Sequence, residues 1–119
     1  MRLLSLIIMA GGIGLAVRAA PLDGEQLFKR QCAVCHSVQP ERTLVGPSLA
    51  KVIDRPAGIM PSFRYSPSMR ASGLIWDRET INAFIESPRA MISGTNMAFP
   101  GEHDPAKRAA IVDYLSTLQ

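Results

Sequence analysis

The residues with the clearest chemistry in this chain are Cys32, Cys35 and His36, which stand together as Cys-Ala-Val-Cys-His. Two thiols two residues apart, followed at once by an imidazole, form the attachment signature for c-type haem. The spacing suits this chemistry because one turn of backbone places both sulfurs over the edge of the macrocycle that carries its two vinyl groups. The histidine is then delivered to the iron on the face that the turn covers. We therefore expect one covalently bound haem c, with His36 as an axial ligand.

Three other kinds of site could use the same residues, and each fits less well. A zinc site needs a fourth ligand, but the sequence has only two cysteines and His103 is its one other histidine. A thioredoxin-like redox pair requires a strand before the motif, where the pattern here is helical. A structural disulfide between Cys32 and Cys35 would close a strained loop that crosslinks almost nothing. Haem attachment therefore remains the prediction.

The pair Gly46-Pro47 bears on how His36 is held. Pro47 has no N–H to donate, but its own carbonyl or the preceding one can accept a hydrogen bond. Such a carbonyl would receive the outer N–H of the His36 ring, which fixes the ring and raises its basicity. A simple turn explains the same two residues equally well, so the sequence leaves both interpretations open.

The elements that must position these residues are predicted to be short helices joined by long loops. Asp23 caps a first helix that runs into Cys32. Ser66, Pro67 and Gly73 mark the cap, the first turn and the end of a short second helix. No period-two strand pattern is evident in the sequence. We therefore predict an all-α fold.

Two longer helices complete the prediction. Asp77 caps a third helix, and Pro88 is expected to end it. Residues 89–101 have the composition of an irregular segment, and Asp104-Pro105 begins the last helix. Apolar residues at helical spacing form one stripe on each helix. They are Ile81, Phe84 and Ile85 on the third helix, and Ile111, Tyr114, Leu115 and Leu118 on the last.

The chain begins with a segment that has the pattern of a secretory leader. Met1-Arg2 is followed by an apolar run over residues 3–17 and by small residues around Ala19. We predict a signal peptide over residues 1–19, cleaved after Ala19, and one domain over residues 20–119. The alternative is an uncut membrane anchor, although the run is short for a bilayer and contains three glycines. Export agrees with thioether attachment, which takes place outside the bacterial cytoplasm.

Charge and size restrict the function further. Loss of residues 1–19 removes two arginines and no acidic residue, so the formal charge falls from +3 to +1. The sequence contains no basic stripe, and we expect no nucleic-acid partner. A domain of roughly 100 residues buries only a marginal core. We therefore expect the haem-free chain to be largely unfolded.

An ordered set of motifs extends over the whole of the domain. It comprises Gly24 and Phe28, the Cys32–His36 motif, Gly46-Pro47-Ser48-Leu49, Arg55, Phe63-Arg64-Tyr65-Ser66, Gly73 and Trp76, Pro88, Gly94-Thr95-Asn96-Met97-Ala98-Phe99, and Tyr114-Leu115. On these residues the chain resembles the class I cytochromes c, and closely resembles their mitochondrial-like branch, from about Asp23 to Gln119. The resemblance implies the class I cytochrome c fold, with short helices and long loops around one covalently bound haem.

The resemblance also implies roles for individual residues. His36 and Met97 would be the axial ligands, because Met97 stands in the family's Gly-Thr-x-Met pattern on a flexible loop. The domain holds three other candidate methionines, Met60, Met69 and Met91, of which Met69 and Met91 are more simply explained as packing residues. Four residues would hydrogen-bond or neutralise the haem propionates: Arg55, Tyr65, Trp76 and Thr95. The first and last helices would meet through Gly24, Phe28, Ile111 and Tyr114.

The predicted site consists of cofactor-binding residues, two of which are also iron ligands. The cofactor-binding residues are Cys32, Cys35, His36, Pro47, Arg55, Tyr65, Trp76, Thr95 and Met97, and the iron ligands among them are His36 and Met97.

Three departures from the family pattern affect the expected properties. Ser93 stands where the family often has proline, which predicts a looser Met97 loop. Phe84 stands where the family usually has a tyrosine whose hydroxyl reaches the methionine sulfur, which predicts a shifted reduction potential. The lysine ring used for docking by mitochondrial members is largely missing, and Glu102 to Pro105 occupy part of that region. The partner should therefore not be assumed to be the mitochondrial one.

These features predict a soluble periplasmic one-electron carrier rather than an enzyme, since both axial positions of the iron would be filled. Its expected partners are redox proteins: a quinol-oxidising complex, a terminal oxidase or a periplasmic dehydrogenase. We expect a monomer, with membrane contact only if the leader is uncleaved. One alternative is a haem enzyme or gas-binding protein with a labile Met97. Another is a dedicated electron-transfer subunit of one dehydrogenase.

Overall fold

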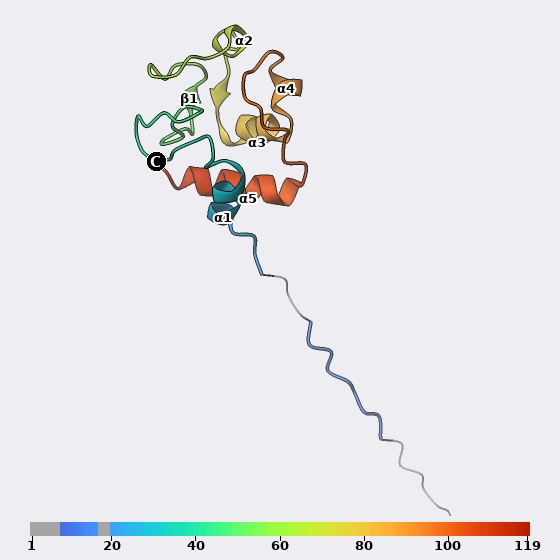
Figure 1. Cartoon of the computed structure of the whole chain (residues 1–119). Coiled ribbons are helices and arrows are strands. Elements are labelled where there is room, and N and C mark those ends of the chain that lie inside the picture. The colour runs from blue at the N-terminus through green and yellow to red at the C-terminus, as the bar shows by residue number, and fades with distance from the viewer. Residues whose placement is uncertain (1–7, 17–19) are drawn as a thin grey trace, which may run out of the picture.

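The computed structural model describes residues 8–16 and 20–119 of the chain (Figure 1). Residues 8–16 run away from the body as an irregular segment with exposed apolar side chains, such as Ile8 and Leu15. The predicted leader, residues 1–19, therefore falls partly outside the described residues. Within those described ranges, none of the helices has both the length and the apolar character needed to cross a membrane.

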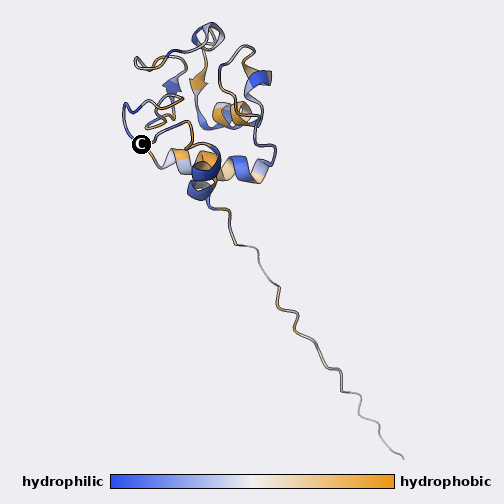
Figure 2. Ribbon diagram, viewed as in Figure 1, coloured by the Kyte–Doolittle hydropathy of each residue, from blue (hydrophilic) through white to orange (hydrophobic). Residues whose placement is uncertain are grey.

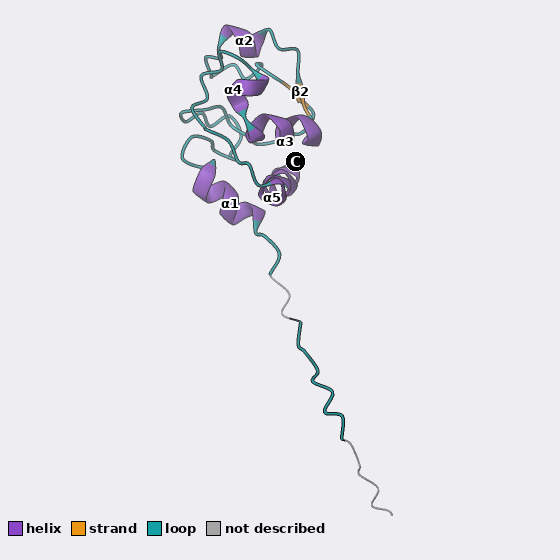
Figure 3. Cartoon of the chain, turned by 90° about the vertical axis from the view of Figure 1, so that its right-hand side faces the viewer, coloured by secondary structure: helices purple, strands orange, loops and turns teal. Residues whose placement is uncertain are grey.

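Five helices and one pair of very short strands make up the described body. They are, in chain order, α1 (Gly24–Gln31), β1 (Arg55–Pro56), α2 (Pro67–Arg70), β2 (Ile75–Trp76), α3 (Arg78–Glu86), α4 (Pro88–Met91) and α5 (Pro105–Ser116). Most of the intervening chain is loop (Figure 3). The prediction of short helices joined by long loops is confirmed.

Each of the four predicted helix starts is confirmed by a side-chain cap. The backbone N–H groups of the first turn donate to the capping oxygens of Asp23, Ser66, Asp77 and Asp104, with distances of 3.2, 3.2, 2.7 and 2.9 Å. These bonds satisfy N–H groups that the helix itself leaves without partners. Helix starts could be located from sequence because the capping signal is local.

Three details of the predicted elements were wrong. Leu118, predicted on the last helix, lies beyond the end of α5 at Ser116. Residues 89–91, predicted to be irregular, belong to helix α4, because Pro88 follows the end of α3 and also occupies the first turn of a new helix. A two-residue antiparallel ladder also joins β1 to β2, with Arg55 opposite Trp76 and Pro56 opposite Ile75. A pairing between segments so far apart in the chain leaves no periodicity to detect.

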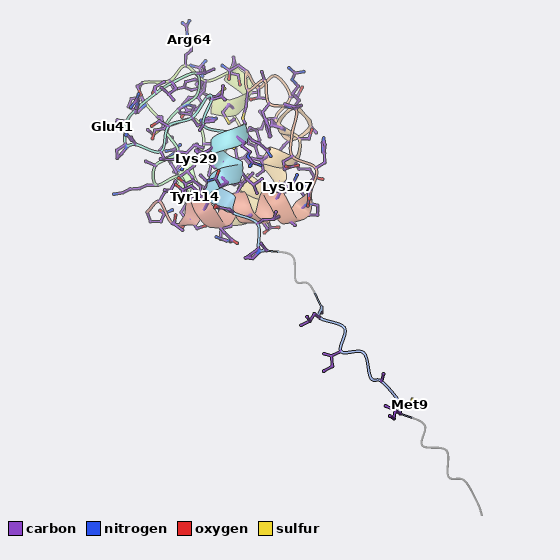
Figure 4. The ribbon with its side chains drawn as sticks, turned by 60° about the horizontal axis from the view of Figure 1, so that its bottom comes forward. Met9, Lys29, Glu41, Arg64, Lys107 and Tyr114 are labelled. Atoms are coloured by element: carbon purple, nitrogen blue, oxygen red, sulfur yellow. The ribbon has the colours of Figure 1, made fainter. Side chains whose placement is uncertain are left out.

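Helices α1 and α5 cross at close range and form the base of the body (Figures 1 and 3). Gly24 permits the crossing, since a Cβ placed there would lie 2.0 Å from the carbonyl oxygen of Ala110. The rings of Phe28 and Tyr114 meet with their centroids 5.3 Å apart, and Figure 4 places Tyr114 at this crossing. Ile111 is only 2% exposed. The predicted contact between the first and last helices is therefore present.

Most apolar residues of the helices, and Trp76 of β2, lie inside the body (Figure 2). The buried core consists of Leu27, Phe28, Val52, Met69, Trp76, Ile81, Phe84, Ile85, Ile92, Ile111, Val112 and Leu115. Helices α1, α3 and α5 supply most of it, and the remainder comes from α2, β2 and loops, namely Met69, Trp76, Val52 and Ile92. Many of these same residues also line a cavity, so the core surrounds a space.

Candidate haem-binding site

A cavity of about 460 Å³ lies within the described part of the chain. Its walls come from the end of α1, from α2, β2, α3 and α5, and from loop residues 45–49 and 95–99. All nine residues of the predicted binding set line it: Cys32, Cys35, His36, Pro47, Arg55, Tyr65, Trp76, Thr95 and Met97. The fold thus brings together residues that are widely separated in the sequence.

The two cysteines lie in a tight turn that continues from α1. The backbone N–H groups of Cys35 and His36 both donate to the carbonyl of Cys32, at 3.0 and 2.9 Å. Both cysteines are free thiols rather than a disulfide. Burial, assisted by the nearby Cys35, raises the pKa of Cys32 to about 11. Among the described residues, no three side chains of His, Cys, Asp or Glu lie close enough together to hold a metal ion. The zinc alternative therefore gains no support.

The ring of His36 is fixed by a single hydrogen bond. Its Nδ1 lies 2.8 Å from the carbonyl oxygen of Pro47. A carbonyl can only accept, so Nδ1 carries the proton and Nε2 keeps its lone pair. Burial lowers the pKa of His36, against the opposing effect of the Pro47 carbonyl, and the nearby charge of Arg55 lowers it further. The ring is therefore held neutral, which is the form that binds a metal. Of the two interpretations of Gly46-Pro47, the structure favours the carbonyl acceptor.

Gly46 lies directly against the imidazole. A Cβ placed on Gly46 would lie 2.4 Å from Cε1 and 2.8 Å from Nδ1 of His36. The backbone N–H of Gly46 also donates to the carbonyl of Cys35 at 2.8 Å. Only glycine allows the chain to approach the ring this closely. Sequence analysis singled out Gly46 as part of a turn but missed this steric role.

Arg55 and Tyr65 already have protein partners in the cavity wall. The Arg55 guanidinium donates to the carbonyls of Ser48 and Ala50 at 2.8 and 3.3 Å, and burial lowers its pKa. The Tyr65 hydroxyl accepts from the backbone N–H of Met60 at 3.2 Å. Both residues thus hold loops in place, and their contact with haem propionates stays a prediction.

Trp76 and Thr95 are placed in the same wall. The ring of Trp76 is 4.9 Å from that of Phe84, measured between centroids. Thr95 accepts through Oγ1 from the backbone N–H of Met97 at 3.3 Å. This contact shapes the loop that carries the methionine. Their predicted propionate contacts likewise stay untested.

Two of the four methionines in residues 20–119 line the cavity, namely Met69 and Met97. Met97 is half-buried, whereas Met69 is only 8% exposed and belongs to the core. The loop of Met97 is tied to the α2 side by Asn96, whose Nδ2 donates to the carbonyl of Arg64 at 3.3 Å. Sequence reasoning placed Met69 in a helix but missed its position in the cavity wall, since helical periodicity does not show which face meets a distant loop.

The residues around the cavity fit a covalently attached haem. Two free thiols lie in one turn, separated in the chain by Ala33 and Val34, and a neutral imidazole offers Nε2 to a metal. The surrounding wall is largely aliphatic and aromatic, as a flat apolar macrocycle requires. Phe84 and Met97 line the same cavity, and Phe84 adds no hydroxyl to its wall.

Comparison with known proteins adds independent support. Residues 22–119 match the family model described as Cytochrome c. The chain is 41% identical to cytochrome c2 of Rhodopila globiformis over 106 residues, which are 89% of this chain and all of that protein. It is 43% identical to cytochrome c2 of Rhodomicrobium vannielii over 98 residues, covering 82% of this chain and 78% of that protein.

Solved structures agree with the sequence comparison. The structure of cytochrome c2 from Rhodospirillum centenum superposes with a TM-score of 0.75 at 36% identity, covering 81% of this chain and 95% of that one. Cytochrome cH from Methylobacterium extorquens gives a TM-score of 0.74, also at 36% identity, over 79% of this chain and 94% of that one.

Proposed function

The chain belongs to the cytochrome c family, with one covalent haem c and the class I fold, and on this premise we propose that it is a soluble, periplasmic one-electron carrier. When bound, the haem iron supplies a one-electron couple between its ferrous and ferric states. The observation that carries the proposal is the placement of His36 and Met97 around one cavity, with the His36 ring already oriented.

In this proposal the two cysteines attach the cofactor and the two ligands tune it. Cys32 and Cys35 would hold the haem through two thioether bonds, each made by addition of a thiol S–H across one vinyl double bond, with no leaving group. His36 presents Nε2 to the iron while Pro47 holds its Nδ1 proton. Met97 supplies a thioether, which favours the reduced state and raises the potential.

The surface beside the thiol turn suits electron exchange. Val34 and Val45 line the cavity and yet are 75% and 73% exposed. The cavity therefore opens to solvent next to Cys35, where a redox partner can approach closely. Around the body the charged side chains are of mixed sign, with Lys29, Glu41, Arg64 and Lys107 at its surface in Figure 4. We expect a redox protein to bind this surface weakly and transiently.

Absorption spectroscopy with methionine variants tests this proposal. The oxidised protein should show a weak far-red band from methionine bound to iron. Met97→Ala should abolish the band, whereas the matched control Met69→Leu should keep it, because both residues line the cavity and only one is proposed to ligate. A wild-type protein without the band would refute Met97 ligation.

Two further measurements separate the alternatives. Rapid carbon monoxide binding by the reduced wild type at neutral pH would favour a gas-binding protein or haem enzyme with a labile Met97. Mass spectrometry of the purified protein would report haem attachment and the mature N-terminus together. A purified protein that still begins at Met1 would contradict cleavage after Ala19 and release of the domain into the periplasm.

A further inference from the structure

On its N-terminal side, the segment that carries Met97 is tied down by Asn96, whose Nδ2 donates to the carbonyl of Arg64 at 3.3 Å. The backbone N–H of Met97 donates to Thr95 Oγ1 at 3.3 Å. Among the hydrogen bonds of the described residues, none involves the next four positions, Ala98 to Gly101. The segment then meets the helices again at Glu102. On the C-terminal side of Met97, the position of the segment therefore depends on how firmly Glu102 is fixed.

Glu102 is hydrogen-bonded to all three long helices. Its backbone N–H donates to the carbonyl of Ile85 in α3 at 2.8 Å, and its carbonyl accepts from Arg108 of α5 at 3.0 Å. Its carboxylate accepts from Nε2 of Gln31 in α1 at 2.9 Å and from the backbone N–H of Asp104 at 3.2 Å. One residue thus joins the end of the loop to α1, α3 and α5.

The partners of Glu102 are themselves held in place. Arg108 is only 8% exposed, and its Nε donates to Asn82 of α3 at 3.1 Å. Just before Glu102, a Cβ at Gly101 would lie 2.1 Å from the carbonyl oxygen of Glu86. The chain therefore passes the end of α3 with no spare room. Movement of this segment is therefore confined to the residues between Met97 and Gly101.

The contact with Gln31 links the two sides of the cavity. Gln31 lines the cavity and directly precedes Cys32 in the chain. The hydrogen bond from Gln31, followed by that from the Asp104 N–H, lowers the pKa of Glu102, so the carboxylate is charged at neutral pH. A hydrogen bond to a charged acceptor is stronger than one between neutral groups.

We propose that Glu102 is a positioning residue that keeps Met97 against the cavity, because its carboxylate ties the end of the Met97 segment to Gln31 and so to the haem-attachment turn. This inference rests on the proposed ligation of the iron by Met97. Without the carboxylate, the segment would detach from the cavity more often, although the backbone bonds of Glu102 to Ile85 and Arg108 would remain.

Carbon monoxide uptake by the reduced holoprotein tests the proposal, since the gas binds only while Met97 is detached. Glu102→Ala and Gln31→Ala should each speed uptake at saturating gas by about tenfold, as expected for the loss of one charge-assisted hydrogen bond. The double variant should be no faster than either single variant, because both changes break the same contact. Glu102→Gln, which keeps an acceptor for Gln31, should restore much of the wild-type rate.

The control is Glu25→Ala, which removes an exposed glutamate of α1 that pairs with Lys29 at 3.2 Å. It should leave the uptake rate unchanged. A wild type without the far-red band would refute Met97 ligation itself, which is a separate failure. If the band is present and both Glu102→Ala and Gln31→Ala take up gas at the rate of Glu25→Ala, the proposal is overturned. Should Glu102→Ala fail to fold, Gln31→Ala decides alone.

Discussion

Replacement of Gly46 by alanine is the most direct perturbation of the His36 site. The added Cβ would lie 2.4 Å from Cε1 of His36, whereas ordinary contact begins near 3.4 Å. The ring or the loop must therefore yield by about 1 Å. A shift of that size exceeds the tolerance of the 2.8 Å bond between Nδ1 and the Pro47 carbonyl. We expect the ring to lose its orientation as well as its packing.

The magnitude follows from two contributions. Overpacking of a closely packed site costs about 1–3 kcal/mol. Loss of the hydrogen bond that orients His36 adds about 1 kcal/mol. Gly46→Ala should therefore lower the free energy of unfolding by about 2–4 kcal/mol, which is a large part of the roughly 5–15 kcal/mol available to a small domain.

Urea unfolding of the holoprotein measures this loss, and the optical spectrum reports on His36 separately. Gly73→Ala is the control, since Gly73 has φ +66° and nothing within 4 Å of an added Cβ. It should cost about 1–2 kcal/mol through backbone strain while leaving the haem spectrum and potential unchanged. Gly46→Ala should change them. If Gly46→Ala unfolds at the wild-type urea concentration with a wild-type spectrum, the steric reasoning is wrong.

Two more changes test the frame around the site. Gly24→Ala places a Cβ 2.0 Å from the carbonyl oxygen of Ala110, so it should separate α1 from α5 and lower the free energy of unfolding by about 2–3 kcal/mol, as measured in urea; an unchanged midpoint would contradict the close crossing. Hydrogen bonds from the backbone and side chain of Thr80 lower the pKa of Asp77 in the folded protein. The stability that this cap contributes is therefore fully present above pH 3.8, the ordinary pKa of the carboxyl group. It is lost as the pH falls through the lowered pKa of the folded state. Asp77→Asn should cap equally well at pH 7 and remove that part of the acid loss, which unfolding curves between neutral and acidic pH would show; equal acid sensitivity of both proteins would refute this.

Much of the fold could be predicted because its signals are local. The caps at Asp23 and Asp77 lie next to the helices they begin, and the turn from Cys32 to His36 is set by the spacing of its own residues. Helix α4 was missed because four residues are too few to show a helical period. The ladder between β1 and β2 was missed because its hydrogen bonds join segments whose order in space only the tertiary fold decides.

The candidate site divides in the same way. Its attachment chemistry follows from one short motif, so sequence alone could predict it. The steric role of Gly46 could not be predicted, since it depends on where the His36 ring points. The roles implied for Arg55 and Tyr65 came only from family resemblance, and in the structure both residues first satisfy nearby backbone groups. Resemblance thus located the right wall of the cavity without establishing what each side chain contacts.

The two proposed ligands differ in the sequence distance of the contacts that hold them. His36 is fixed by Pro47, only 11 residues away. The segment of Met97 is held by Asn96 reaching Arg64 across 32 residues and by Gln31 reaching Glu102 across 71. Local contacts survive small changes in tertiary packing, whereas contacts between distant segments depend on the whole fold. The methionine side is therefore where loop substitutions such as Ser93 can alter ligand strength while the attachment chemistry at Cys32 to His36 stays intact.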